Sequence, residues 1–481
     1  MIDSNIVVQQ LRQIVGADNA FLFADAAADS QREIIGPTPQ GSQTPAAVVL
    51  PESVKEIQTL LSMAGPLGYS VATIPNNSGN GARVQNRARP SVVVDCRRMN
   101  KIIEANVDSG YALIEPGVSF DQLRDHLIAN DTGYWIDCDT NGANSVSGSV
   151  LDRSFGYTPY GDHLMMQCGM EVVMANGEVM RTGMGAVPGS DTWQLFKYNY
   201  GPYLDGLFSR SDMGIVTKLG LWLMPAPPAY HPFMVSLPNM AALEQAVEVL
   251  RPLKIQMIVP NTVVVSHLSS DAALIRDAGQ ADVADALLAR TDPNLSEWNL
   301  FGALYGLPDN VEITWQMVSA ALGTISGAVI SSPSDSPNHP VWPLREQLMR
   351  GEPAYSKVGA EKSRELWFSA SAPLEGEAGT AMSAIANEVL GGAGIHFTVE
   401  LLLTWRTLFM RVSIPYDVSE LAQRRESALA VVARLNDAGF AISHDSLELT
   451  SAIAQAHTSD AMNELQANLS AALDPNGILR A

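Results

Sequence analysis

FGYTPYGDHLMMQCGMEVVMANGEVMRTGMG, residues 155–185, carries two signals. In its second half, Asn176-Gly177 separates MEVVMA from EVMRTG. An Asn-Gly pair between alternating apolar residues predicts a β-hairpin. Its first half places two glycines, two tyrosines, Asp162 and His163 within residues 156–163. An ordinary core does not need this composition, whereas glycine lets a backbone pass close to a large planar, phosphorylated cofactor.

Length and composition limit the class of protein. At 481 residues the chain is too long for one core, so we expect two or more domains. With 46% hydrophobic and 17% charged residues, the composition is that of a globular protein. No apolar run reaches the roughly 18 residues that span a membrane. The start, MIDSNIVVQQLRQIVG, lacks the basic and apolar blocks of a signal peptide, so we expect a cytoplasmic protein.

Charge and cysteine content exclude several kinds of partner. The net charge of -21 argues against nucleic acid or an anionic membrane, and we attribute it to solubility. The three cysteines, Cys96, Cys138 and Cys168, have an odd count and no metal-binding spacing. We therefore expect neither a disulfide scaffold nor a bound metal.

Two kinds of pattern divide the chain. The first 225 residues hold short β runs between Gly, Asn and Pro turns, with helices expected over 54–63 and 120–128. The proline cluster PAPPAY (225–230) predicts a boundary. Longer units follow it, and they predict an α+β domain with a sheet and covering helices. The predicted helices are 240–251, 271–289, 310–322, 376–390, 417–437 and 450–472, and the predicted strands are 256–266, 299–305, 365–371, 396–403 and 407–414.

The loop ATIPNNSGNG (72–81) follows a predicted strand and is dense in glycine and small polar residues. Such a loop can turn successive backbone N–H groups toward a pyrophosphate. The same composition is also common in plain turns, so this loop alone does not identify a site.

Four further blocks support a cofactor site: VDCRRMNKI (94–102), YALIEPGVSFDQL (111–124), NSVSGSVLDRSFGYTPYGDH (144–163) and LFSRSDMGIVTKLGLWLMP (207–225). Their order and spacing resemble the vanillyl-alcohol oxidase and p-cresol methylhydroxylase family of FAD enzymes. The resemblance extends over nearly the whole chain and includes WNLFGALYG (298–306). It implies an α+β protein with a p-cresol methylhydroxylase-type FAD-binding domain of two α/β subdomains. This domain would span 1–227, an α+β substrate-binding cap with an antiparallel sheet would span 228–438, and 439–481 would return to the FAD domain.

Carried over by position, the resemblance implies FAD contacts in six segments. The first would hold the pyrophosphate and the last would lie beside the adenine. Asn76 stands where the family commonly has Arg, so backbone donors would balance more of the pyrophosphate charge. The segments are Asn76, Asn77, Ser78, Gly79, Asn80 and Gly81; Pro116, Gly117 and Val118; Thr140; Ser145, Gly148 and Ser149; Gly156, Tyr157, Gly161 and Asp162; and Gly214, Ile215 and Val216.

The chain departs from the family at the substrate. Members that oxidise phenols hold the phenolate with two tyrosines and an arginine, which stabilise the anion. Asn80 and the pair Ser443-His444 occupy those positions here, so we expect this clamp to be lost. The aspartate usually near flavin N5 aligns with Thr140, and Asp139 precedes it, so either could take that place.

The residue that links the flavin in many members also differs. Glu365 stands at the position of a flavin-linking histidine, and no His or Tyr occurs from Glu361 to Ala372. Carboxylates do not form the usual link, so we predict noncovalent FAD.

New polar residues accompany these losses. Glu400 falls in a predicted strand that faces the substrate in relatives, and His396, four residues earlier, would share its face. Glu400 or His444 could act as general base. Alternatively, His396 is a core residue, and Glu400 forms a structural ion pair with Arg406 or Arg411. Trp367 and Trp405 would line the pocket or serve only as packing.

We therefore predict an FAD-dependent oxidoreductase that transfers a hydride from an alcohol, benzylic or allylic carbon of a small, non-phenolic substrate to flavin N5. Asn80, Ser443, His444 and Glu400 would be its polar contacts. Oxygen or another acceptor would reoxidise the flavin, and the resemblance implies a homodimer or larger assembly. One alternative is oxidation of 4-alkylphenols or 4-hydroxybenzylic alcohols, with His444 in place of the clamp. Two others are a degenerate FAD-binding subunit without activity and a dehydrogenase that passes electrons to a cytochrome.

Overall fold

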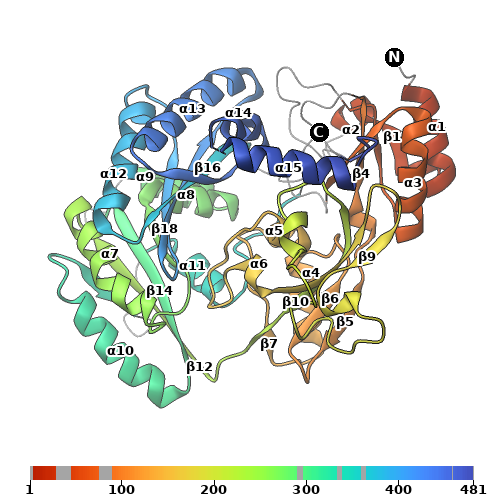
Figure 1. Ribbon diagram of the computed structural model, residues 1–481. Coiled ribbons are helices and arrows are strands. Elements are labelled where there is room, and N and C mark those ends of the chain that lie inside the picture. Colours follow the sequence, from red (N-terminus) through yellow and green to blue (C-terminus); the bar gives the residue numbers. More distant parts are fainter. Residues whose placement is uncertain are drawn as a thin grey trace.

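The computed structural model describes residues 4–28, 45–74, 89–289, 296–332, 339–358, 364–457 and 459–479, and Figure 1 shows their arrangement. The N-terminal layer is a four-stranded sheet in which β2, β4 and β3 are parallel and β1 is an antiparallel edge. Its strands are almost continuously apolar because both faces are covered. The elements are α1 (Ser4–Val15), β1 (Ala20–Leu22), α2 (Phe23–Ala28), β2 (Ala47–Val49), α3 (Val54–Leu67), β3 (Ser70–Ile74) and β4 (Ser91–Asp95).

A five-stranded antiparallel sheet follows, in the order β5-β6-β10-β8-β9. It confirms the predicted hairpin: Val173 pairs with Val179 around Asn176-Gly177, and Gly177 has a φ of 83°. A positive φ at this place is the backbone conformation that glycine adopts readily. The elements are β5 (Ile102–Asn106), β6 (Tyr111–Ile114), α4 (Phe120–Ala129), β7 (Tyr134–Trp135), α5 (Val146–Leu151), α6 (His163–Met166), β8 (Gln167–Val173), β9 (Val179–Arg181), β10 (Ile215–Trp222) and β11 (Met224–Pro225).

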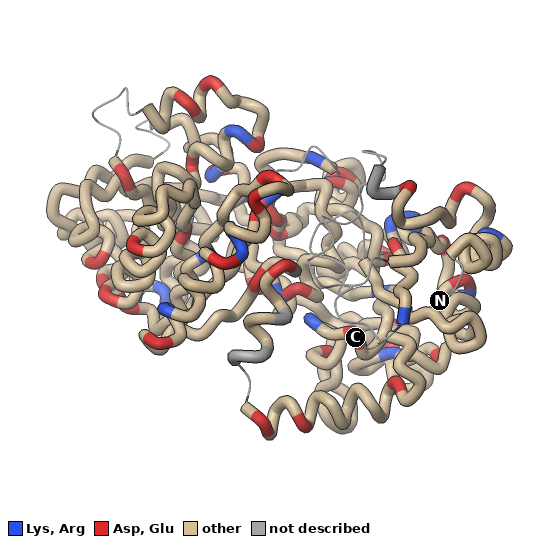
Figure 2. The backbone as a smooth tube through the Cα atoms, turned by 90° about the horizontal axis from the view of Figure 1, so that it is seen from above, with Lys and Arg blue, Asp and Glu red and all other residues tan. Residues whose placement is uncertain are grey.

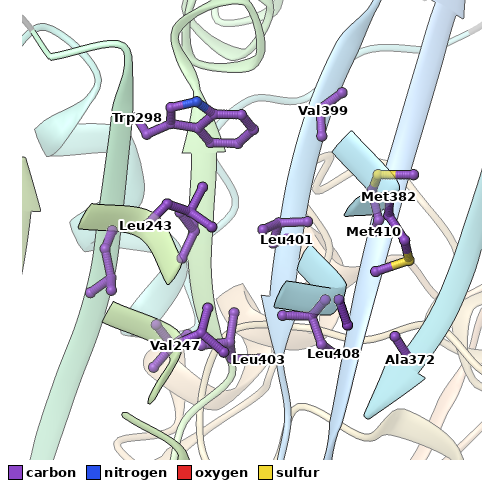
Figure 3. Close-up of a cluster of buried hydrophobic side chains, with 14 of the residues drawn as sticks. Leu243, Val247, Trp298, Ala372, Met382, Val399, Leu401, Leu403, Leu408 and Met410 are labelled. Atoms are coloured by element: carbon purple, nitrogen blue, oxygen red, sulfur yellow. The ribbon is translucent and has the colours of Figure 1, made fainter. Parts of the chain in front are cut away.

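The largest layer is an eight-stranded antiparallel sheet in the order β15-β12-β14-β13-β17-β18-β16-β19. Helices α7, α10, α12 and α13 cover one face. Figure 3 shows part of this core, where Leu243 and Val247 of α7 and Met382 of α12 lie against Leu401 and Met410 of the strands. The strands are β12 (Ala229–Leu237), β13 (Val263–His267), β14 (Trp298–Gly306), β15 (Val329–Ser331), β16 (Glu365–Pro373), β17 (Thr398–Leu403), β18 (Thr407–Pro415) and β19 (Ala441–Asp445), and the helices are α7 (Met240–Ile255), α8 (Leu268–Asp277), α9 (Ala281–Leu288), α10 (Pro308–Leu322), α11 (Trp342–Met349), α12 (Gly376–Ala386) and α13 (Leu421–Asp437).

The other face of this sheet, called the inner face below, turns toward the N-terminal part. Val264 and Phe301 from this face share one buried cluster with Ile114 and Leu219 of the five-stranded sheet. Side chains alternate along a strand, so residues between those of the helix-covered core also belong to the inner face. The two parts of the chain therefore meet across the inner face.

The chain returns to its N-terminal part at the very end. β19 still pairs with β16, so the chain leaves the large sheet after residue 445 and not at 439. Two helices follow, α14 (Leu447–His457) and α15 (Asp460–Leu473), and Figure 1 shows α15 lying between the two parts. The Ile478 carbonyl then accepts a hydrogen bond from the Val71 N–H (2.7 Å).

Several predicted boundaries were wrong for local reasons. The helix predicted over 271–289 is two helices, α8 and α9, because Gly279 between them has a φ of 87°. The strand predicted from 256 begins at Val263, and the last helix, predicted over 450–472, is divided into α14 and α15. Strand β12 was missed because its start overlaps the proline cluster.

Acidic residues are distributed over the whole described backbone. Asp and Glu lie along both parts of the backbone in Figure 2. Among the described residues, no helix combines the length and apolar character needed to cross a bilayer. The described residues also hold no cluster of three or more His, Cys, Asp or Glu suited to a metal, and the three cysteines are free and buried.

Candidate active site

The signature loop, residues 155–163, is fixed by one buried carboxylate. Asp137 Oδ1 lies 2.8 Å from His163 Nε2, and Asp137 Oδ2 accepts the Thr158 N–H at 2.6 Å. The other ring nitrogen of His163 lies 2.8 Å from Ser149 Oγ. Gly156 is required here, because a Cβ at this position would lie 1.4 Å from Asp137 Oδ1. The predicted cofactor residue Asp162 caps α6 by accepting the Met165 N–H (3.0 Å).

Two other predicted cofactor segments meet beside this loop. Ser145 Oγ donates to the Pro116 carbonyl (2.6 Å) and accepts the Gly148 N–H (2.9 Å). The Val146 N–H donates to the Val118 carbonyl (3.0 Å). Gly117 lies so close to three carbonyls that a Cβ would stand 2.7–2.8 Å from them. The structure therefore brings 116–118, 145–149 and the signature loop together.

The buried hydroxyl of Ser147 indicates whether this surface fits FAD. Ser147 Oγ is buried and finds no hydrogen-bond partner among the described residues. A buried polar atom without a partner is costly, so a ligand atom is expected to complete it. Together with the glycines and serines around it, this hydroxyl fits a large polar cofactor such as FAD.

The predicted adenine segment, Gly214, Ile215 and Val216, lies at the start of β10. Ile215 and Val216 begin β10 and are buried in two hydrophobic clusters. Gly214 packs on Val172, whose Cγ1 lies 2.4 Å from a Cβ built on that glycine. The predicted pyrophosphate loop, Asn76–Gly81, lies outside the described residues.

The signature loop also faces the inner face of the large sheet. The Phe155 ring lies 5.1 Å from the Phe409 ring of β18, and Asn261 Nδ2 donates to the Tyr157 carbonyl (3.2 Å). Burial raises the pKa of Tyr157, and the nearby Glu400 carboxylate raises it further. Tyr157 therefore joins the cofactor surface to the charged groups of the inner face.

Charged side chains cluster on the inner face. Arg411 lies opposite Glu400 in the β17–β18 ladder, contacts Glu365 at 3.4 Å and stands over the Trp367 ring at 5.1 Å. The side chains of Arg411 and Glu365 are 34% and 39% exposed, although this face packs against the N-terminal part. These two side chains therefore keep partial solvent exposure on a face that is otherwise packed.

Glu400 has a partner that was not predicted. Its carboxylate pairs with Arg345 of α11 (2.5 Å), not with Arg406 or Arg411. Burial alone would raise the pKa of Glu400, but Arg345, with a smaller contribution from Arg411, outweighs burial and lowers it. Glu400 is therefore a carboxylate at neutral pH.

Comparison with known proteins fits this geometry. The model of an FAD binding domain matches residues 45–183. Over 496 aligned residues the chain is 32% identical to the 4-cresol dehydrogenase [hydroxylating] flavoprotein subunit of Pseudomonas putida, covering 99% of this chain and 94% of that protein. A structure of p-cresol methylhydroxylase with substrate bound matches with a TM-score of 0.87 and 30% identity, covering 99% and 96% of the two chains. The 4-ethylphenol oxidase from Gulosibacter chungangensis matches with the same TM-score and 25% identity, covering 99% and 95%.

The chain belongs to the p-cresol methylhydroxylase family. It is an FAD-dependent oxidoreductase with the family's FAD-binding fold, as the sequence predicted.

In this family member, His444 is held as a neutral ring. Its Nε2 lies 3.0 Å from the Arg153 carbonyl and its Nδ1 lies 2.9 Å from Ser443 Oγ. Burial, followed by the nearby Arg210, lowers the pKa of His444 to about 4. Ser443 Oγ also lies 3.1 Å from the Ser369 carbonyl. Both predicted polar contacts therefore bind protein atoms in the structure.

Two predicted pocket residues are displaced from the cluster. His396 precedes β17 and is exposed, so it does not share a strand face with Glu400 as expected. Trp405 lies in the β17–β18 turn, whereas Trp367 pairs with Ser413 near the other end of β18. The two tryptophans therefore do not line one site.

Asp139, Thr140 and Tyr355 form another side of the site. Asp139 accepts the Thr140 N–H (2.7 Å) and the Asn144 side-chain amide (2.8 Å). The Thr140 carbonyl accepts the Tyr355 N–H (3.2 Å), which ties the segment after α11 to the FAD domain. Burial raises the pKa of Tyr355, as do nearby carboxylates that include Asp139. Tyr355 and Arg345 were not predicted, because neither lies in a recognisable sequence motif.

Proposed function

We propose that this enzyme oxidises a neutral small organic substrate at a hydroxyl-bearing, benzylic or allylic carbon. When bound, FAD supplies the hydride acceptor at flavin N5. The protein binds and orients the substrate on the inner face and removes its hydroxyl proton.

The charge balance of the inner face carries this proposal. Arg411 is surrounded by the carboxylates of Glu365, Glu400 and Asp139. Arg345 is already shared between Asp271 and Glu400. Because these described groups hold more carboxylates than guanidinium groups, they favour a neutral ligand over an anion. A phenolate would meet net repulsion there, whereas a neutral alcohol would meet a carboxylate that can accept its proton.

Within this proposal, Glu400 is the general base. Its lowered pKa keeps it ionised at neutral pH, and its side chain is 16% exposed on the inner face. His444 is the weaker candidate because both of its ring nitrogens contact protein atoms. Asp139 lies near Arg411 and accepts hydrogen bonds from Thr140 and Asn144, so we assign it to orientation of the site.

One observation favours a second candidate, oxidation of 4-alkylphenols or 4-hydroxybenzylic alcohols. Tyr157 lies in the field of Arg411, and Tyr355 lies near Glu365. Two phenols and a guanidinium could stabilise a phenolate in place of the residues lost at positions 80, 443 and 444. The names of two relatives, a 4-cresol dehydrogenase subunit and a 4-ethylphenol oxidase, point the same way.

The test of Glu400 is the rate of anaerobic flavin reduction by a panel of benzylic and allylic alcohols. Loss of a general base typically costs ~10²–10⁴ in rate, so Glu400→Gln should slow reduction by that factor while FAD content is unchanged. Glu388→Gln is the matched control, because Glu388 pairs with Arg434 on the exposed surface. Equal rates in Glu400→Gln and the control would exclude Glu400 as the base.

A further inference from the structure

A buried ion network stands behind Glu400. Arg345 on α11 is 2% exposed and Asp271 on α8 is 0% exposed, and they pair at 3.0 Å. The same Arg345 nitrogen, Nη2, also contacts Glu400 at 2.5 Å. Glu400 is the most exposed of the three side chains, at 16%. The network therefore joins the helices α8 and α11 to the solvent-accessible side of β17.

Asp271 is held from two further strands. Its Oδ1 accepts the Ser266 hydroxyl (2.6 Å) from β13, and its Oδ2 lies 3.4 Å from Asn299 Nδ2 on β14. Arg345 stands over the Phe301 ring at 5.4 Å. Because both groups are fixed by neighbours other than Glu400, their positions do not depend on the carboxylate that they orient.

A structural ion pair would be complete without Glu400. Asp271 alone neutralises Arg345, so the second carboxylate needs further compensation from Arg411, which lies opposite it on β18. A buried ion group is often no more stable than well-packed apolar residues, so stability alone does not explain a third charged member. Its place on the inner face, beside Arg411 and Tyr157, suggests that the network serves the substrate side.

We propose that Arg345 and Asp271 are positioning residues that hold the Glu400 carboxylate in one orientation, ionised and turned toward the substrate. The inference rests on the proposed function in one respect, that Glu400 accepts the substrate proton. Arg345 donates to Glu400 without contacting the reacting atoms, and Asp271 fixes Arg345.

Five charged or titratable groups surround Glu400. Arg345 from α11 and Arg411 from β18 favour its ionised form. Asp271 from α8, Glu365 from β16 and Tyr157 from the signature loop oppose it when they are ionised. Removing Arg345 together with Asp271 leaves burial and Glu365 opposed mainly by Arg411. The pKa of Glu400 should then rise, and the acid limb of the rate profile should move to higher pH. An opposite charge at this distance typically shifts a pKa by about 1–3 units.

Two variants test the network. Arg345→Lys keeps a cation but loses the planar guanidinium group, which can bind two carboxylates at once. Arg345→Met combined with Asp271→Asn removes both charges together, so that no buried aspartate is left without its cation. Arg434→Lys is the control, because Arg434 and Glu388 form an ion pair whose two side chains are exposed to solvent.

Two measurements apply to each FAD-loaded variant. The first is the pH dependence of flavin reduction at saturating alcohol. The second is the protonation midpoint of Glu400 from infrared difference spectra between each variant and the same variant with Glu400→Gln. We expect the midpoint of the rate profile and the infrared midpoint of Glu400 to rise by about one pH unit or more in the double variant. Both midpoints should rise by less in Arg345→Lys. The control should match the wild type.

An unchanged infrared midpoint of Glu400 in the double variant would overturn the inference. A raised infrared midpoint with an unchanged rate profile would also overturn it, because Glu400 would not then limit the reaction. If no alcohol reduces the wild-type flavin, the proposed function fails. In that case the infrared midpoint alone still decides whether Arg345 keeps Glu400 ionised.

Discussion

Replacing Gly156 with Ala should break the anchor of the signature loop. The new Cβ would lie 1.4 Å from Asp137 Oδ1 and 2.9 Å from His163 Nε2. Asp137 would have to move, and its bonds to His163 (2.8 Å) and to the Thr158 N–H (2.6 Å) would be lost. Hydrogen bonds to a charged group are worth about 1.5–3 kcal/mol each, so the two together predict a loss of ~3–6 kcal/mol in the free energy of unfolding. That is a large share of the 5–15 kcal/mol by which a protein is typically stable.

The assay is denaturant unfolding followed by tryptophan fluorescence, together with FAD content after purification. Gly206→Ala is the matched control, because a Cβ there meets nothing within 4 Å. It should change stability by less than about 1 kcal/mol. The double variant Gly156→Ala/Asp137→Ala removes the colliding carboxylate, so it should be no less stable than Asp137→Ala alone. If Gly156→Ala behaves like Gly206→Ala, or if the two changes are additive, the anchor is not what requires glycine.

Three further predictions concern the cofactor and pH. FAD should pass into the supernatant on acid precipitation, because the family resemblance implies that Glu365 replaces the flavin-linking residue. A yellow pellet would contradict noncovalent binding. Burial lowers the pKa of Lys254 to about 7, below the ~10.4 of an unfolded lysine. The unfolded chain therefore binds more protons than the folded chain between these two pH values. The free energy of unfolding of the wild type, relative to that of Lys254→Met, should rise from pH 7 to about 10 in urea unfolding. A difference between the two proteins that does not change with pH would refute this. The pKa of His444, about 4, lies below the value of ~6.5 in an unfolded chain, so the unfolded wild type binds more protons between these values. The wild type should therefore lose more stability than His444→Gln as the pH falls from 6.5 to 4. An equal loss in the two proteins would show that the ring is not held neutral.

Features with a local cause were predictable from the sequence. The hairpin at Asn176-Gly177 forms because the turn needs a positive φ that glycine supplies. Helix α4 begins where Ser119 accepts the Gln122 N–H (3.1 Å), close to the predicted start. The glycines of the signature loop were predicted to admit a cofactor, whereas the structure shows that Gly156 makes room for the Asp137 side chain.

Features that depend on distant residues were not predictable. Arg345, Asp271 and Glu400 come from two helices and a strand, and none of their local sequences indicates a charged partner. β17 begins at Thr398, so His396 lies outside the strand and does not share a strand face with Glu400 as predicted. The pairing of β19 with β16 fixed His444 against the Arg153 carbonyl, a contact between residues 291 positions apart.

The most direct test of the central claim is anaerobic flavin bleaching with a matched pair of substrates, 4-hydroxybenzyl alcohol and its 4-methoxy ether. An enzyme that removes a hydroxyl proton from a neutral alcohol on an acidic inner face should be reduced by both compounds. Reduction by the phenol alone would show that phenolate activation survives and would contradict the account. Reduction by neither would also contradict it, and would point to another substrate class or to a flavoprotein without activity.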